Sequence, residues 1–171
     1  MAENAKSLQN DVATLEEEVV SMLEELGLTL TTAESCTAGL VAGRIMNVAG
    51  ASTVYNEGYI TYSNEAKHKL LGVKEETLET YGAVSHNTAY EMAKGAAKAA
   101  GADAALSVTG IAGPGGGTKE KPVGLVYIGC YLNGKVRTEE FHFTKDRAGN
   151  RESSVEEALK LLREELLALR K

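Results

Sequence analysis

The order of hydrophobic patterns along the chain is the feature that most constrains the fold. Stretches with helical spacing alternate with short β-rich stretches up to about residue 108, and two more β-rich stretches, 123–132 and 135–143, then flank Asn133-Gly134. This dipeptide is the strongest short signal for a β-hairpin. Alternating helices and strands favour parallel pairing, whereas a hairpin adds antiparallel strands. The order therefore predicts an α/β fold: a single three-layer αβα domain with a mixed sheet.

The individual elements follow from apolar spacing and from helix-ending signals. Gly27 and Gly101 follow amphipathic stretches as natural stops, while Ser85 and Asp146 are candidate N-caps. The expected helices cover 11–26, 37–46, a segment that starts near Ser63, 85–100, and a long segment after residue 146. The expected strands cover 28–33, 55–62, 103–108, 123–132 and 135–143.

Length and charge restrict the function classes. A chain of 171 residues favours one domain, which we place at 11–171 after a flexible N-terminal segment, 1–10, that is polar and unpatterned. Asp and Glu number 24 against 18 Lys and Arg, and this net charge of −6 is opposite to the basic surface of nucleic-acid binders. No run of 18 apolar residues and no signal peptide is visible, so we expect a cytoplasmic protein without membrane or nucleic-acid partners.

Cysteine and histidine spacing gives no metal site. Cys36 and Cys130 lack close Cys or His companions, so we expect reduced thiols and no metal. The alanine-rich segment 85–100 and the long apolar stripe of the last helix suggest a symmetric partner surface, and therefore a homo-oligomer, a dimer or higher.

A glycine-rich loop is the first candidate for chemistry. Five of the eight residues 110–117 are glycine, which lets backbone N–H groups approach an anion closely. The loop matches neither the Walker A nor the dinucleotide-binding fingerprint. A phosphate or carboxylate site and a flexible excursion are equally compatible with this composition.

Ser35 is the second candidate, because it lies at an expected strand-to-helix turn. There the backbone amides of Cys36 and Thr37 are placed to stabilise an oxyanion. The alternative is that Ser35 only caps the following helix, and the flanking residues do not match the nucleophile-elbow motif. Cys36 is a rival nucleophile, although small buried cysteines are usually inert.

A serine nucleophile needs a base, and the three histidines are scattered without evident partners. Lys67 could serve if burial lowers its pKa; an exposed lysine, or a surface pair with Ser63, is the ordinary alternative. Arg147 and Arg151 form a cationic pair suited to a phosphate, or pair with Glu152 or Glu156 on the same helix.

Several longer strings extend these observations. They are TAESCTAG at 32–39, YSNEAK at 62–67, GAVS at 82–85, TGIAGP at 109–114 and KPVG at 121–124. With these strings in this order, the chain resembles the CinA C-terminal domain family, the nicotinamide-mononucleotide deamidases, from about residue 12 onward.

The resemblance implies hydrolysis of the carboxamide of nicotinamide mononucleotide to nicotinate mononucleotide and ammonia, in pyridine nucleotide salvage and without a cofactor. It places the nucleophile on Ser35, the catalytic lysine on Lys67 and an assisting tyrosine on Tyr62. It also implies that the loop closes over the substrate. The substrate-binding residues it implies are Thr109, Gly110, Gly113, Gly115, Gly116, Arg147 and Arg151.

Two positions depart from the family pattern. The family usually has Asp at Gly115 and Gly at Lys145, which concerns substrate preference around the loop and the phosphate. Many members also carry an N-terminal domain for pyrophosphate hydrolysis, and here we expect only the deamidase part. The alternative function is a catalytically silent nucleotide-binding module that uses the glycine loop and the two arginines.

Overall fold

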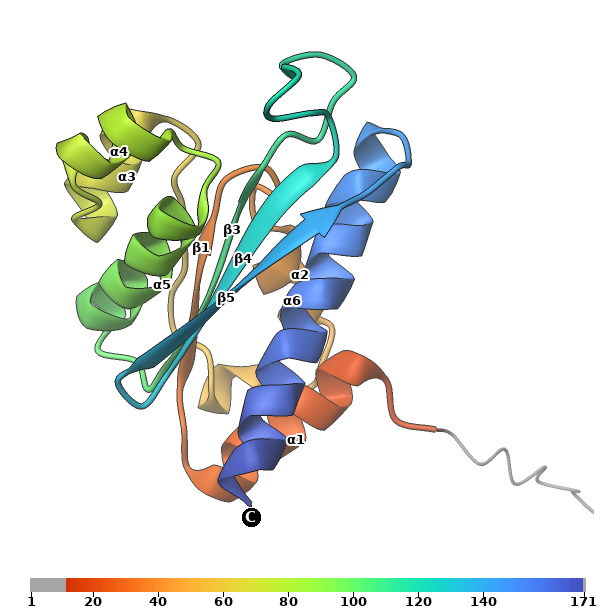
Figure 1. Cartoon of the computed structure of the whole chain (residues 1–171). Helices are drawn as coiled ribbons and strands as arrows, with labels where there is room; N and C mark the ends of the chain where they lie inside the picture. The colour runs from red at the N-terminus through yellow and green to blue at the C-terminus, as the bar shows by residue number, and fades with distance from the viewer. Residues whose placement is uncertain (1–11, 171) are drawn as a thin grey trace, which may run out of the picture.

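The computed structural model describes residues 12–170, which form a five-stranded sheet between two layers of helices (Figure 1). The expected flexible segment 1–10 lies outside the described residues. The elements in chain order are α1 (Leu15–Leu26), β1 (Leu30–Glu34), α2 (Leu40–Met46), a 3-10 turn (Ala51–Thr53), β2 (Tyr59–Ile60), α3 (Asn64–Leu71), α4 (Glu75–Tyr81), α5 (His86–Ala100), β3 (Ala104–Gly110), β4 (Leu125–Leu132), β5 (Lys135–His142) and α6 (Arg147–Leu169).

The sheet is mixed, as the sequence predicts. Its order is β2-β1-β3-β4-β5, with β1 parallel to both β2 and β3, and with β4 antiparallel to β3 and β5. Asn133 and Gly134 connect β4 to β5 with φ angles of 46° and 88°. Both angles are left-handed, which the favoured two-residue hairpin turn requires and which these two residue types tolerate. The α/β fold is thereby confirmed.

The helices cover the two faces of the sheet. α3, α4 and α5 lie on one face and α1, α2 and α6 on the other (Figure 1). The larger apolar core fills the second face, with Leu23, Leu106 and Leu162 fully buried. The smaller core lies under α5 around Met92 and Ala96.

Small side chains let α5 pack closely on its neighbours. A Cβ atom at Gly95 would overlap the carbonyl oxygen of Leu71 at the end of α3, and Ser107 on β3 donates a 2.6 Å hydrogen bond to the carbonyl of Ala89. The alanine stripe that suggested a partner surface is therefore buried against the same chain. The apolar stripe of α6 is buried in the same way as far as Leu166, whereas Leu169 at its end is 46% exposed.

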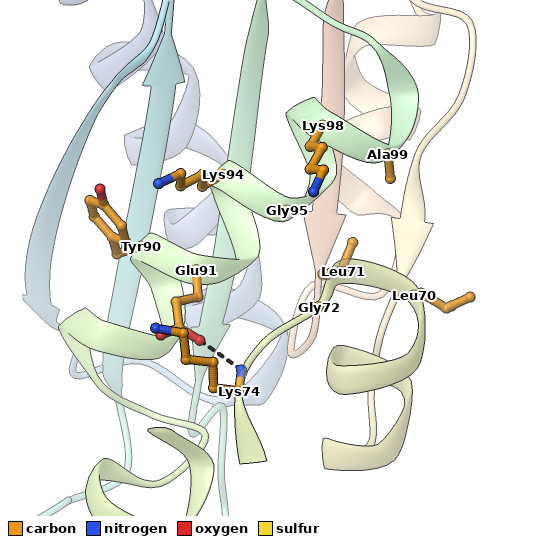
Figure 2. A pocket seen from close by; sticks show the side chains of 10 residues that line it. All are labelled: Leu70, Leu71, Gly72, Lys74, Tyr90, Glu91, Lys94, Gly95, Lys98 and Ala99. Atoms are coloured by element: carbon orange, nitrogen blue, oxygen red, sulfur yellow. Dashed lines mark hydrogen bonds between the residues drawn. The ribbon is translucent and has the colours of Figure 1, made fainter. Parts of the chain in front are cut away.

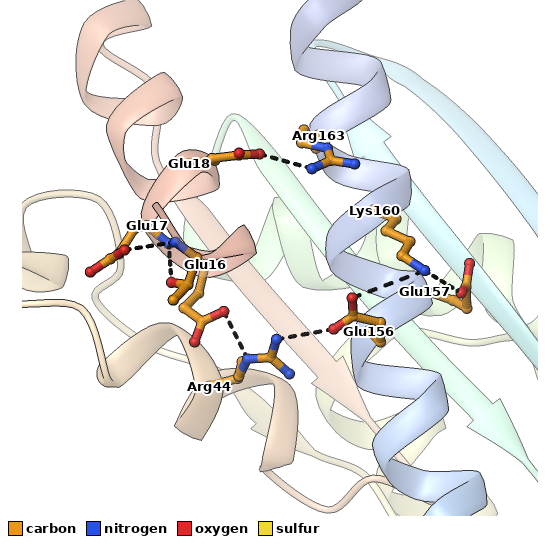
Figure 3. A network of polar contacts seen from close by, with 9 residues as sticks. Glu16, Glu17, Glu18, Arg44, Glu156, Glu157, Lys160 and Arg163 are labelled. Atoms are coloured by element: carbon orange, nitrogen blue, oxygen red, sulfur yellow. Dashed lines mark hydrogen bonds and ion pairs between the residues drawn. The ribbon is translucent and has the colours of Figure 1, made fainter. Parts of the chain in front are cut away.

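Charged side chains connect the helices of the second face at their outer edge (Figure 3). Arg44 on α2 lies 2.8 Å from Glu16 on α1 and 3.0 Å from Glu156 on α6. Arg163 on α6 also pairs with Glu18 on α1 at 2.8 Å. These pairs tie the start of α1 and the last turn of α2 to α6.

Several local expectations differ from the structure. The helices expected from residues 11 and 37 start at Leu15 and Leu40, because Thr14 and Gly39 occupy their N-cap positions. The strand expected at 55–62 is only Tyr59–Ile60, because β2 is an edge strand that pairs with the end of β1 alone. β3 extends two residues beyond 108, through Gly110. α4 was not expected, since its seven residues contain too few apolar positions to show a helical period. Within residues 12–170, no helix combines the length and apolarity needed to cross a membrane.

Candidate active site

Ser35 lies in the turn directly after β1, at the carboxyl end of the parallel strands. Its amide donates to the carbonyl of Val108 at 2.9 Å, which fixes the residue against the end of β3. The side chain is 8% exposed. The expected placement of Ser35 at a strand-to-helix turn is thus confirmed, with Gly39 rather than Ser35 at the cap position of α2.

Lys67 reaches Ser35 from the neighbouring helix. It lies in α3, which Ser63 caps through a hydrogen bond from the amide of Ala66. The ammonium nitrogen Nζ of Lys67 is 3.0 Å from Ser35 Oγ and 2.8 Å from the carbonyl oxygen of Thr61. Ser63 therefore shapes the helix, and the lysine pairs with Ser35 instead.

Burial controls the protonation of Lys67. Its side chain is only 1% exposed, and no carboxylate in residues 12–170 forms an ion pair with it. Removal from water lowers the pKa of Lys67 to about 8. In the neutral amine, two N–H groups can donate to the carbonyls of Thr61 and Tyr62 while the lone pair faces the Ser35 hydroxyl. This is the geometry of a nucleophile and its base.

The rival nucleophile has the opposite electrostatics. Burial raises the pKa of the Cys36 thiol to about 11, against the lowering effects of a backbone hydrogen bond and of Arg151 and Lys67. The thiol therefore keeps its proton at neutral pH. Of the two adjacent candidates, only Ser35 has a base in contact.

A cavity of about 340 Å³ opens beside the Ser35–Lys67 pair. Ten of the expected site residues share it, although they come from the ends of two strands, from α3, from the glycine loop and from α6. Its walls are formed by Ser35, Cys36, Tyr62, Lys67, Ala83, Val84, Thr109, Gly110, Ile111, Ala112, Gly113, Gly115, Gly116 and Arg147.

The glycine loop is held in place by contacts from both sides. Arg147 donates a 2.7 Å hydrogen bond to the carbonyl of Gly113, which has a left-handed φ of 85° and lies tightly against Val123. The hydroxyl of Thr109 donates a 2.7 Å hydrogen bond to the carbonyl of Ala83. The hydroxyl of Thr109 therefore links the end of β3 to the segment before α5.

Tyr62 has a different position from the one its expected role suggests. Its backbone carbonyl lies 3.4 Å from Lys67 Nζ, whereas its side chain is 66% exposed. The phenol hydroxyl makes no hydrogen bond within residues 12–170. The phenol therefore lies at the mouth of the cavity rather than between Ser35 and Lys67.

Arg151 lies behind the Ser35 turn. Its Nε donates to the carbonyl of Cys36 at 2.9 Å, and its Nη2 donates to the carbonyl of Thr37 at 3.1 Å. It does not line the Ser35 cavity, but with Lys145 and Arg147 it lines a neighbouring hollow of about 680 Å³ at the start of α6. The alternative of a pair with Glu156 is not observed, since Glu156 contacts Arg44 and Lys160.

Sequence reasoning missed the role of Glu34. This fully buried carboxylate accepts hydrogen bonds from the amides of Val41 at 2.8 Å and Ala42 at 3.1 Å, in the first turn of α2. The sequence signal for this role is a glutamate shortly before a helix whose N-cap residue, Gly39, has no side chain that could accept hydrogen bonds from the first helical amides. The amides of Cys36 and Thr37 therefore lie in the turn before α2 rather than in its first turn.

A larger groove of about 530 Å³ lies between the end of α3 and α5 (Figure 2) and shares no lining residue with the Ser35 cavity. Three lysines and an aromatic ring line it together with small and apolar residues. It contains no serine, threonine or cysteine, so it offers no nucleophile of the kind found at Ser35. Its residues are Leu70, Leu71, Gly72, Lys74, Tyr90, Glu91, Lys94, Gly95, Lys98 and Ala99.

Comparison with known proteins shows the family of the chain. The family model described as the CinA C-terminal domain matches residues 12–166. The chain belongs to the CinA C-terminal domain family. The match covers the Ser35 turn, α3, the glycine loop and the start of α6, so every residue of the candidate site falls inside the CinA domain.

Two curated relatives illustrate the match. A CinA-like protein of Kosmotoga olearia is 58% identical over 156 residues, which cover 91% of this chain and 38% of the relative. A putative competence-damage inducible protein of Clostridium novyi is 56% identical, over 90% of this chain and 37% of the relative. The chain thus spans less than two-fifths of the length of these relatives.

Solved CinA structures share the fold. The competence/damage inducible protein CihA of Agrobacterium tumefaciens has a TM-score of 0.84 and 44% identity, covering 94% of this chain and 98% of that one. A CinA superfamily protein of Klebsiella pneumoniae has a TM-score of 0.87 and 37% identity, covering 90% and 96%.

Proposed function

We propose that this CinA domain hydrolyses the carboxamide of nicotinamide mononucleotide to nicotinate mononucleotide and ammonia. The observation that carries the proposal is the buried, unpaired Lys67 whose Nζ lies 3.0 Å from Ser35 Oγ. A lysine whose pKa is lowered by burial has one evident use beside a serine hydroxyl, which is to accept its proton when the amine is neutral.

The first half of the reaction forms an ester. Neutral Lys67 takes the proton of Ser35, and the serine oxygen attacks the carboxamide carbon. The carbonyl oxygen becomes an oxyanion beside the amides of Cys36 and Thr37. The ammonium of Lys67 then returns its proton to the amide nitrogen, the C–N bond breaks and ammonia leaves.

The second half releases the acid. Water attacks the ester carbon while Lys67 accepts one of its protons, and the same proton then returns to Ser35 as the ester bond breaks. Nicotinate mononucleotide and the free serine result. The exposed ring of Tyr62 lies at the cavity mouth and is placed to contact the pyridine ring as it enters.

The phosphate end is assigned to the start of α6. Arg147 lines both the Ser35 cavity and the adjoining hollow, where Lys145 adds a second positive charge. Neither side chain forms an ion pair within residues 12–170. Unpaired cations at a helix N-terminus favour an anion such as a phosphate.

The test is a steady-state ammonia assay with nicotinamide mononucleotide. Wild type should release ammonia, and Ser35→Ala should fold normally and lose nearly all turnover, because the ester can no longer form. Substrate binding, measured by calorimetry, should survive in this variant.

The matched control is Ser21→Ala, an exposed serine on α1, which should keep full activity. If Ser35→Ala retained more than a few per cent of the activity, Ser35 would lose the nucleophile role. If the wild type bound the mononucleotide and released no ammonia, the domain would be the silent nucleotide-binding module.

A further inference from the structure

Charged side chains form hydrogen bonds with the backbone on two sides of the turn that carries Ser35. On one side, the carboxylate of Glu34 accepts hydrogen bonds from the amides of Val41 and Ala42 at the start of α2. On the other side, the guanidinium of Arg151 donates hydrogen bonds to two consecutive carbonyls, those of Cys36 and Thr37. The segment between these contacts includes Ala38, whose φ of 48° is a strained value for alanine.

These contacts determine where the backbone amides of the turn point. The Cys36–Thr37 peptide bond is trans, so its N–H group points opposite to the carbonyl that Arg151 holds. Arg151 belongs to α6, and α3 with Lys67 covers the other face of the sheet (Figure 1). The Thr37 amide hydrogen is thereby directed away from α6, to the side of the turn that Lys67 approaches.

The N–H groups of Cys36 and Thr37 are free to donate hydrogen bonds to a ligand. Within residues 12–170, neither the Cys36 nor the Thr37 amide donates a hydrogen bond to another residue, whereas the next amide, that of Ala38, donates to the carbonyl of Ser35 at 3.2 Å. Ordered donors without an acceptor, one residue and two residues after a nucleophile, are suited to an anion that appears only during the reaction.

We propose that Arg151 is a positioning residue for the oxyanion-binding amides, and that it does not bind the substrate phosphate. It orients the Thr37 amide directly, through the carbonyl of Cys36, and the Cys36 amide indirectly, because the Thr37–Ala38 peptide that it also holds donates from Ala38 to the carbonyl of Ser35. This inference rests on the proposed deamidation and changes the role expected for Arg151. Two of its guanidinium nitrogens are already committed to the turn, and Arg147, whose side chain reaches the cavity itself, is the better placed phosphate ligand.

The first experiment separates the two roles by steady-state kinetics. Arg151→Lys keeps the charge but cannot span both carbonyls. It should lower kcat about a hundredfold, as loss of one oxyanion donor does, with little change in KM for the mononucleotide. The preference for the mononucleotide over nicotinamide riboside should stay at the wild-type ratio. Arg147→Lys should change that ratio, and Arg163→Lys, elsewhere on α6, should change neither quantity.

The second experiment uses an aldehyde analogue, pyridine-3-carboxaldehyde mononucleotide. Ser35 Oγ bonds to the aldehyde carbon, its proton passes to Lys67, and the aldehyde oxygen becomes the oxyanion. Such mimics bind in proportion to transition-state stabilisation. Arg151→Lys should weaken the analogue by the same factor as kcat/KM, while affinity for the product nicotinate mononucleotide stays the same.

Three results would overturn the proposal. One is a raised KM for the mononucleotide with unchanged riboside turnover, which would make Arg151 a phosphate ligand. Another is an unchanged kcat. The third is loss of folding in both Arg151→Lys and Arg151→Gln, which would make the arginine a residue of the fold alone.

The failure of the proposed function is seen separately, as absence of ammonia release by the wild type. The positioning role then still has an independent readout in the amide resonances of the turn. In ¹H–¹⁵N spectra, the Arg151→Lys substitution should shift the amide resonances of Cys36 and Thr37 more than those of Val41 and Ala42, whose amides donate to Glu34. Equal shifts, or none at Cys36 and Thr37, would contradict it.

Discussion

Lys67 is a long cationic side chain almost completely removed from water, and its proton links catalysis to folding. Burial brings its pKa from the ordinary value of 10.5 to about 8. At neutral pH most of the lysine is still charged in the folded state, and no carboxylate in the described part of the chain pairs with it. The neutral amine is therefore both the form that burial favours and the form that can accept the proton of Ser35.

The rate should therefore rise with pH through one ionisation near 8, as Lys67 loses its proton. A pH profile of kcat/KM measures this limb. Lys67→Arg should be inactive at every accessible pH, because a guanidinium keeps its proton. Lys69→Ala, an exposed lysine on the same helix, serves as the control and should keep the wild-type profile. An active Lys67→Arg enzyme would show that the lysine only orients the substrate.

The same pKa shift predicts a stability change of defined sign. Between pH 8 and 10.5 the unfolded chain binds more protons at Lys67 than the folded chain, so stability rises with pH across this window. The rise should be on the order of 3 kcal/mol. Urea unfolding of wild type and Lys67→Met at several pH values measures it: the difference between the two proteins should move in favour of wild type as the pH increases. A pH-independent difference would contradict burial of the charge.

At the scale of the elements, the site depends on how closely α3 approaches α5. Gly95 allows this approach, since a Cβ atom there would overlap the backbone of Leu71. α3 carries Lys67 three residues after its start at Asn64. A displacement of α3 would therefore move the base away from Ser35.

Gly95→Ala should accordingly destabilise the fold by about 1–3 kcal/mol, as overpacking does, and should lower kcat as well. Gly43→Ala is the matched control, because this helical glycine in α2 has open space around it. It should gain about 0.5–1 kcal/mol from reduced chain entropy. Thermal unfolding and the ammonia assay measure both effects. Equal behaviour of the two variants would mean that the α3–α5 contact is loose.

How far the sequence predicts these elements depends on the signals each one carries. α1, α5 and α6 combine an apolar stripe with a capping residue, and the end of α1, both ends of α5 and the start of α6 match the expected positions closely, whereas α1 starts four residues later than expected. α4 has neither a clear stripe nor a side-chain cap, and Lys74 at its N-cap position makes no capping hydrogen bond. β2 is short because the number of paired residues depends on the neighbouring strand, which a local pattern does not contain.

At the scale of the whole molecule, the substrate is expected to bridge two hollows that share Arg147 and Ala112. We expect the reacting end at the carboxyl end of β1 and the phosphate end at the start of α6. A substrate without the phosphate keeps the first set of contacts and loses the second.

Nicotinamide riboside should therefore be the poorer substrate, with kcat/KM at least about tenfold lower, since a charge-assisted hydrogen bond contributes roughly 1.5–3 kcal/mol. Arg147→Ala should remove most of this preference. Arg137→Ala, an arginine on the distant strand β5 that pairs with Glu139, should keep it. Equal efficiency for both substrates in the wild type would assign Arg147 to the glycine loop alone.

The sequence predicts which residues form the site better than it predicts how they are arranged. Ser35, Lys67 and Arg147 carry the expected residue types, and topology brings them to one cavity. The roles of Tyr62 and Arg151 depend on which way each side chain or carbonyl points, and that direction is set by packing with distant elements. Glu34 was missed for the same reason, since its contacts lie seven and eight residues away on the next helix.

The left-handed backbone of Ala38 has a consequence for selection experiments. Ala38 and Asn133 are the two non-glycine residues of the described chain with positive φ, and only Asn is a type that accepts it readily. Ala38 is exposed, so a polar side chain has room there. A screen for heat resistance would be expected to recover Asn or Gly at this position early. A library chosen on survival alone would then relax the turn behind Ser35, and the most heat-resistant clones would be the slowest catalysts.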